Sequence, residues 1–151
     1  MVAFFQHKNK SRLYPVLKLD FPAHLHRAVE FGYLEEGECT LTVEGTDFSL
    51  ERGDVFIIFP ERVHLFENSK NIRGYLGFAL PEEFPLFAPY FSEIFPASPV
   101  VKKESLGEAA GELFRRAAED PELESRGVVH GYVSLLLGKL IPRLPKGSQQ
   151  G

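Results

Sequence analysis

Short apolar segments of strand length, separated by turn signals, occupy residues 16–80 and limit the folds open to this chain. Residues 39–43 alternate between apolar and polar side chains, as a half-buried strand does. The chain turns at Glu44-Gly45, and an apolar run of strand length follows at residues 55–59. Because turns roughly 8–12 residues apart are typical of sandwiches and barrels, the pattern predicts an all-β unit. Its first strand is expected at residues 16–19.

The pattern changes after Pro81. Prolines recur among bulky aromatic residues as far as residue 99, which predicts a packed but irregular crossing segment. The capping-box pattern at residues 105–108 then predicts an amphipathic helix. Asp120-Pro121 predicts the start of a second helix, because a cap residue precedes a proline at the first helical position, and Pro142 ends it.

The second helix has an apolar arc that is too wide for a helix with one buried face. We therefore expect part of this arc to pack against a second copy of the chain, although simple core packing is the alternative. The residues assigned to dimerisation are Val129, Tyr132, Val133, Leu136, Leu137 and Leu140.

Length and charge narrow the function classes. A chain of 151 residues has room for one compact domain, and its formal net charge of −4 argues against binding nucleic acid by itself. The single cysteine, Cys39, excludes an internal disulfide. No apolar run approaches the roughly 18 residues of a membrane span, and the polar N-terminus does not resemble a signal peptide. A cytoplasmic protein without a membrane partner is expected.

Three histidines and one glutamate form a candidate metal site. His24 and His26 would face the same side of a strand, roughly 7 Å apart. On a straight strand Glu30 would lie about 13 Å beyond His26, so the chain must turn at residues 27–29 for these groups to meet. His64 comes from a later strand. Such a set suits Zn, Fe, Mn or Ni about equally, and the sequence does not choose among them.

The spacing His24-x-His26-x3-Glu30-x6-Gly37 resembles the first motif of the cupin family. Residues 53–68 resemble the second motif, although Pro60 lies one place later than expected and Arg62 replaces the usual glycine. Within the cupins, residues 12–144 are most similar to the N-terminal sensor domain of AraC-type transcription regulators. The residues that carry this similarity are His24-x-His26, Glu30, Glu36-Gly37, Glu44-Gly45, Gly53-Asp54, Pro60 and His64-x-Phe66, followed by two helices.

The resemblance implies a mainly β fold: a cupin barrel (double-stranded β-helix or jelly roll), followed by a C-terminal antiparallel helical pair. It also implies a DNA-binding helix-turn-helix domain, which is not in this chain. The expected division is an arm (1–15), a barrel core (16–80), the crossing segment (81–104), a two-helix dimerisation unit (105–142) and a linker (143–151) toward that domain. Only five residues follow Lys146, so we expect a sensor module from a longer regulator, or else a stand-alone cupin.

The barrel is expected to bind a small-molecule effector such as a sugar, a polyol or a small acid. The residues assigned to effector binding are His24, His26, Glu30, His64, Phe66 and Tyr75. The first four also form the candidate metal site, or they serve as hydrogen-bonding groups without a metal, as is general for AraC-type sensors. The main expectation is a regulator rather than an enzyme; the alternative is a metal-dependent cupin dioxygenase or isomerase acting on a small polar substrate.

Overall fold

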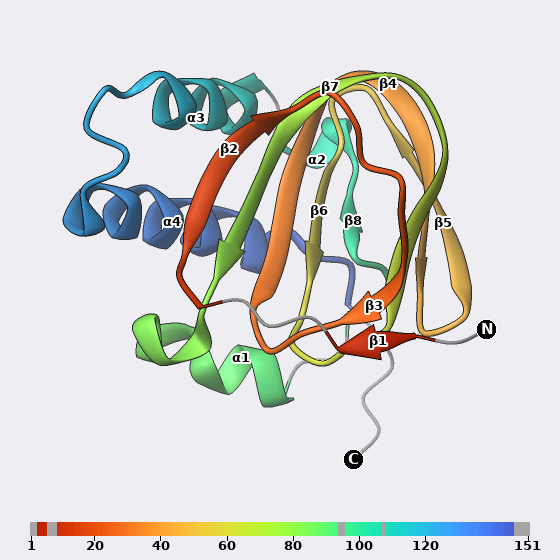
Figure 1. Ribbon diagram of the computed structural model, residues 1–151, viewed down its shortest axis with the longest axis horizontal. Helices are drawn as coiled ribbons and strands as arrows, with labels where there is room; N and C mark the ends of the chain where they lie inside the picture. Colours follow the sequence, from red (N-terminus) through yellow and green to blue (C-terminus); the bar gives the residue numbers. More distant parts are fainter. Residues whose placement is uncertain (1–2, 6–8, 94–95, 107, 147–151) are drawn as a thin grey trace.

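The chain folds into a curled sheet with helices on one outer face. The computed structural model describes residues 3–5, 9–93, 96–106 and 108–146. Eight strands form one sheet that curls on itself into a jelly-roll barrel, and two antiparallel helices pack beside it (Figure 1). The predicted fold class, mainly β with a C-terminal helical pair, is confirmed.

Two long strands form the centre of the sheet. β4 (Val29–Val43) and β7 (His64–Ala79) pair antiparallel from one end of the barrel to the other. Glu35-Glu36-Gly37 is a turn signal in the sequence, but the turn it predicts is wrong, because β4 continues through these residues. The register shifts there, and Gly37 has a φ of 95°. A Cβ at Gly37 would lie 2.4 Å from the Lys70 carbonyl oxygen, so only glycine fits.

Shorter strands complete the sheet on both sides of this pair. β2 (Arg12–Val16) and β3 (Phe21–Leu25) pair with β7, and β1 (Phe4–Phe5) pairs with β3. β5 (Thr46–Glu51) and β6 (Val55–Ile58) pair with β4, and β8 (Val100–Val101) pairs with β6. The first strand expected at residues 16–19 is therefore wrong: β2 ends at Val16, and residues 17–20 connect it to β3.

The buried side chains form two main apolar layers on opposite faces of the sheet. The barrel interior contains Leu34, Leu41, Leu50 and Phe56, none of which is more than 1% exposed. The second layer lies between the sheet and the helices and is centred on Phe114. Phenylalanines contribute to both layers: Phe56 and Phe66 to the first, Phe31 and Phe114 to the second.

The chain after β7 first crosses the end of the barrel and then returns as helices. The crossing segment contains η1 (Pro81–Glu83), η2 (Pro85–Phe87) and α1 (Ala88–Glu93). After β8 come α2 (Lys103–Leu106), α3 (Glu108–Glu119), α4 (Arg126–Leu140) and η3 (Ile141–Arg143). No helix among the described residues is long and apolar enough to cross a membrane. Residues 147–151 of the expected linker, and residues 1, 2 and 6–8 of the expected arm, lie outside the described residues.

The second helix begins later than the sequence predicts. Its expected start at Asp120-Pro121 is wrong, because α4 begins at Arg126. The Asp120 carboxylate instead accepts hydrogen bonds from the backbone N–H of Glu122 at 2.8 Å and from the Tyr132 hydroxyl at 2.6 Å. An aspartate that bonds its own backbone two residues on favours a turn over a helix. These bonds also link the α3–α4 loop to the side of α4.

Most of the residues assigned to dimerisation lie inside the monomer. Val133, Leu136, Leu137 and Leu140 are 0% exposed and belong to the layer between α4 and the sheet. For these four residues the prediction is wrong, because the arc of α4 that carries them is already covered by the chain's own core. Val129 and Tyr132 are partly buried against the same layer. The outward face of α4 carries other residues, among them Leu135, which is 48% exposed.

Neighbouring leucines on α4 provide a matched test of this assignment. Leu136→Ala leaves a cavity in the fully covered layer, so we expect it to lower the free energy of unfolding by about 2–5 kcal/mol. Leu135→Ala removes a half-exposed side chain and should change it by about 0.5 kcal/mol or less under conditions where the chain is monomeric. Urea denaturation followed by circular dichroism measures both; equal losses would contradict the assignment.

Candidate metal centre and ligand cavity

The four predicted ligand residues meet at one end of the barrel. His24 lies on β3, His26 just after it, Glu30 on β4 and His64 at the start of β7. His24 and His64 are register partners across β3 and β7. One ligand atom from each of the four residues can be chosen so that all lie within 4.8 Å of one another, and each residue is at most 3% exposed. We name these four residues the His/Glu cluster.

The chain bends at Arg27 and Ala28, as the spacing of the ligands requires. The bend is held from inside by His26, whose Nδ1 lies 2.8 Å from the Ala28 carbonyl oxygen. The backbone N–H of Glu61 donates to the His26 carbonyl oxygen at 2.8 Å. Glu61 itself has a φ of 61°. Arg62 is not among the residues with a positive φ, so its backbone conformation does not require the glycine that is usual at this place.

Each imidazole is oriented by a backbone carbonyl oxygen. The Nδ1 atoms of His24, His26 and His64 lie 2.9, 2.8 and 2.7 Å from the carbonyl oxygens of Pro22, Ala28 and Arg62. A carbonyl oxygen can only accept a hydrogen bond, so each Nδ1 carries the proton. The Nε2 atoms of the three rings then present lone pairs that can bind a cation or a second proton, which is how metal-binding histidines are held.

The Nε2 atoms converge on one carboxylate oxygen. Oε1 of Glu30 lies 2.9 Å from His26 Nε2, 3.0 Å from His64 Nε2 and 3.8 Å from His24 Nε2. Both the carboxylate and a neutral Nε2 present lone pairs, so contacts this short need a proton or a cation between them. The chemistry of this donor set, three nitrogens and one oxygen on buried side chains, therefore fits a divalent transition metal.

The electrostatics of the cluster follow from the same contacts. Burial alone would raise the pKa of Glu30, but hydrogen bonds from His24, His26 and His64 outweigh it and hold the pKa of this carboxyl well below its usual range. Burial would lower the pKa of His64, yet the hydrogen bond to Glu30 raises it above the usual value. The cluster thus favours a charged carboxylate with positive charge beside it, supplied by protons or by a metal ion.

A cavity of about 290 Å³ opens beside the cluster, and we name it the ligand cavity. His24 and Glu30 form part of its wall. The remaining wall comes from the β2–β3 segment and from β7: Tyr14, Val16, Lys18, Leu19, Asp20, Phe21, Phe66, Leu76 and Phe78. A small molecule in this cavity would therefore lie directly against the candidate metal centre.

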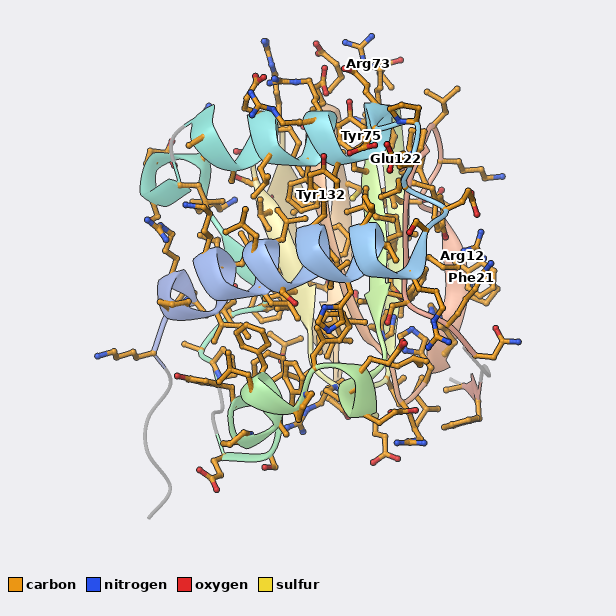
Figure 2. All side chains as sticks on the ribbon, turned by 90° about the vertical axis from the view of Figure 1, so that its left-hand side faces the viewer. Arg12, Phe21, Arg73, Tyr75, Glu122 and Tyr132 are labelled. Carbon is orange, nitrogen blue, oxygen red and sulfur yellow. The ribbon has the colours of Figure 1, made fainter. Side chains whose placement is uncertain are left out.

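Two further residues were predicted to bind the effector, and the structure separates them. Phe66 lines the ligand cavity with His24 and Glu30. Tyr75 lies on the opposite face of β7, where its ring stacks on Phe114 of α3 with centroids 6.3 Å apart (Figure 2). The assignment of Tyr75 to the effector site is therefore wrong, because its side chain packs under the helices.

Several wall residues of the ligand cavity were not predicted. Leu76 and Phe78 follow Phe66 at even spacing, so alternation with period two along β7 could have found them. Tyr14 belongs to the expected arm and Lys18 to the expected first strand, which Asp20 follows. No local pattern indicates that this segment covers the cavity, because its position depends on the pairing of β2 with the far end of β7.

Comparisons with known proteins agree with this architecture. Residues 14–73 match the family model of the cupin domain, and no curated protein matches the chain. The chain is similar in structure to the AraC-like transcriptional activator CuxR, with a TM-score of 0.57 and 12% identity over 83% of this chain and 45% of that chain. It is also similar to ToxT from Vibrio cholerae, with a TM-score of 0.52 and 9% identity over 93% of this chain and 60% of that chain.

At these identities the two structures show a shared fold. The matches cover more of the chain than the cupin-domain residues, and the chain itself spans about half the length of the two proteins. The resemblance to the cupin family, expected from the spacing of His24, His26 and Glu30, is confirmed. Residues 14–73 are therefore similar to the cupin domain, and the chain shares its fold with the AraC-like activator CuxR and with ToxT.

Proposed function

We propose that the chain is the ligand-sensing module of an AraC-type DNA-binding transcription regulator. The observation that carries this proposal is the arrangement of a barrel and a helical pair that CuxR and ToxT share over 83% and 93% of this chain. The barrel holds a cavity for a small-molecule effector, and the helices on its outer face provide a surface for a second copy. DNA would be bound by a helix-turn-helix domain outside the sequence given.

The proposed sensor site combines the ligand cavity with the His/Glu cluster. Buried polar groups that converge at one end of an apolar cavity orient small ligands, which here include sugars, polyols and small acids. A bound Zn, Ni, Fe or Mn ion would be held by His24, His26, Glu30 and His64 and would supply a Lewis-acidic contact to the ligand. Those four residues and Phe66 are therefore the proposed effector-binding set.

The proposed dimer surface is the outward face of α4. Gly127, Gly131 and Gly138 lie on this face together with Ser134 and Leu135. A Cβ at Gly127 or Gly131 would meet nothing within 4 Å, so packing within the monomer does not require glycine there. Glycine in a helix costs roughly 1 kcal/mol relative to alanine. Close approach of a partner helix would explain why glycine stands at these positions.

An apolar groove borders this helix face. It has a volume of about 810 Å³ and runs between α4 and the segment from Glu83 to Phe87. Leu86 on the far side of the groove is 79% exposed, and Leu135 on the near side is 48% exposed. Exposed apolar side chains that face each other across a groove are typical of surfaces that bind a partner. A second copy of α4 would cover both leucines.

A metal-dependent cupin enzyme is the second candidate function. The His/Glu cluster itself favours it, because four buried ligands beside a cavity could hold a metal with a position open to substrate. A dioxygenase or an isomerase for a small polar substrate would use this arrangement. The helical pair is the feature that an enzyme of this kind leaves unexplained.

If the His/Glu cluster binds a metal, we expect one divalent transition metal ion per chain. Glu30→Gln keeps the size of the side chain but removes the charge that the three imidazoles surround. We expect it to weaken metal affinity by more than the roughly 10–100-fold that the loss of an outer-shell partner costs. Metal analysis by mass spectrometry and competition with a chromogenic chelator measure stoichiometry and affinity.

Glu67→Gln is the matched control, because Glu67 is exposed on β7, the strand that carries His64, and its substitution should leave the affinity unchanged. If the wild-type chain contains no metal and takes up none when offered Zn, Ni, Fe or Mn, the metal assignment is wrong.

If the chain dimerises through the outward face of α4, we expect Leu135→Glu to produce monomers. A carboxylate at this half-exposed position would be buried without a partner in the dimer, whereas in the monomer it remains in water. Gly131→Gln should act in the same direction, because it fills the space into which a second helix packs. Size-exclusion chromatography with light scattering at tens of micromolar measures the change, with Arg116→Glu on α3 as the control.

The regulator assignment is tested by the genomic reading frame and by DNA binding. We expect the frame to continue beyond Gly151 for about 100 residues with two helix-turn-helix patterns. Footprinting with the full-length product should then show a protected site whose occupancy changes when the effector is added. A stop codon soon after Gly151 would favour the enzyme, and substrate screening with the metal-loaded chain would follow.

A further inference from the structure

A short connection between two strands forms the part of the ligand cavity wall that the sheet does not hold in place. Residues 17–20 join β2 to β3 and belong to no strand or helix (Figure 1). Lys18, Leu19 and Asp20 of this connection line the ligand cavity. The other wall residues lie on β2, β3, β4 and β7, where strand pairing fixes them. We name residues 17–20 the strap.

Few contacts hold the strap against the barrel. Within the described part of the chain, no backbone hydrogen bond outside the strand ladders involves the strap, and Leu17 is 77% exposed. Two side chains make the attachment. Leu19 is 7% exposed and packs in the apolar layer of the barrel interior, and the Asp20 carboxylate accepts a hydrogen bond from the Ser69 hydroxyl of β7. A segment attached in this way opens with a smaller free energy than the strands that flank it.

These observations give the ligand cavity a movable wall. We propose that the strap opens and closes as a unit while the rest of the barrel stays folded, and that this movement sets how far the ligand cavity is open to solvent. In the closed position, Leu19 fills part of the barrel interior and Asp20 binds Ser69. In the open position both contacts are broken. The inference rests on the proposed sensor function for the role of the cavity, and it adds how a ligand enters and leaves.

A buried thiol near the strap reports this movement. Cys39 of β4 is 5% exposed and belongs to the same apolar layer as Leu19. Burial, and to a smaller extent the nearby Asp20 carboxylate, raise the pKa of this thiol to about 12. Because the thiolate is the reactive form, Cys39 reacts slowly while the strap is closed. Opening withdraws Leu19 and Asp20 from the thiol and exposes it to water, so its reactivity rises.

Because Cys39 is the single cysteine of the chain, thiol labelling measures this movement directly. The reaction with dithiobis(nitrobenzoate) is followed by absorbance at about pH 8, with neither an effector nor a metal ion added. For the wild-type chain we expect a labelling rate that is nearly independent of urea up to about 1 M, because local opening exposes little surface. Unfolding of the whole chain would instead make the rate rise steeply with urea.

Loss of the contact between Asp20 and Ser69 should favour the open strap. Ser69→Ala removes the hydroxyl without changing the charge near Cys39, so we expect labelling to become about two- to tenfold faster. Asp47→Ala is the matched control, because it breaks a similar hydrogen bond, donated by the Thr42 hydroxyl, in the β4–β5 pair. This control should leave the labelling rate unchanged.

Two leucines of the strap provide a second matched pair. Leu19→Ala removes the buried side chain that holds the strap in the barrel, and it should accelerate the labelling of Cys39 at least about tenfold. Leu17→Ala removes a largely exposed side chain and should have no effect on the labelling rate.

The possible results have separate meanings. Faster labelling of Ser69→Ala and Leu19→Ala, with both controls unchanged and little dependence on urea, supports the proposal. A wild-type rate that rises steeply with urea overturns it, because the thiol is then reached only by unfolding. Equal effects of Ser69→Ala and Asp47→Ala, or of Leu19→Ala and Leu17→Ala, overturn it as well. The reading frame and footprinting decide the regulator assignment separately, because the labelling requires neither DNA nor an effector.

Discussion

The buried carboxylate of Glu30 is the group on which one end of the barrel depends. It is 3% exposed, and Nε2 atoms from three imidazoles lie within 3.8 Å of one of its oxygens. A charge in such a place is costly unless positive charge and hydrogen bonds surround it. The three strands that supply these groups, β3, β4 and β7, are thereby fixed relative to one another. A proton or a metal ion at this point is therefore part of the structure as well as of any chemistry.

The sheet carries the two proposed activities on its two faces. β7 presents Phe66 and Phe78 to the ligand cavity, while Tyr75 of the same strand packs under Phe114 of α3. A displacement of β7 on the cavity side would therefore shift the helices on the other side, because protein interiors are close-packed and transmit small displacements. Effector binding and dimer geometry would be coupled in this way through one strand, without a separate relay of residues.

The fold and the His/Glu cluster could be predicted from the sequence because both depend on local sequence patterns. Short alternating segments predict strands wherever one face is buried, and the spacing of His24, His26 and Glu30 requires the bend that the structure contains at Arg27 and Ala28. The features that the sequence misses depend on contacts between distant segments. Gly37 reads as a turn, yet the Lys70 carbonyl oxygen packs against it and β4 continues. Asp120 reads as a helix cap, yet its carboxylate also binds Tyr132.

Two errors have a more specific origin. The spacing of the α4 leucines shows that the helix has a wide apolar arc. It does not show how much of that arc is covered by other parts of the same chain. The sheet and α3 cover Leu136 and Leu137 completely, and the glycines mark the side that is left open. Tyr75 lies at odd spacing from Phe66 along β7, and its side chain accordingly packs on the other face of the sheet.

The pairing of β1 with β3 has a consequence for the speed at which the site is filled and emptied. β3 carries His24 near the edge of the sheet. Among the described strands β1 alone lies beyond it, with Phe4 opposite His24 and Phe5 opposite Leu25. On its other side, β3 meets β7 through only two register pairs. Such an edge opens with a smaller free energy than the central pair β4–β7. Exchange of a bound ion would therefore follow the opening rate of this edge, while the rest of the barrel stays folded.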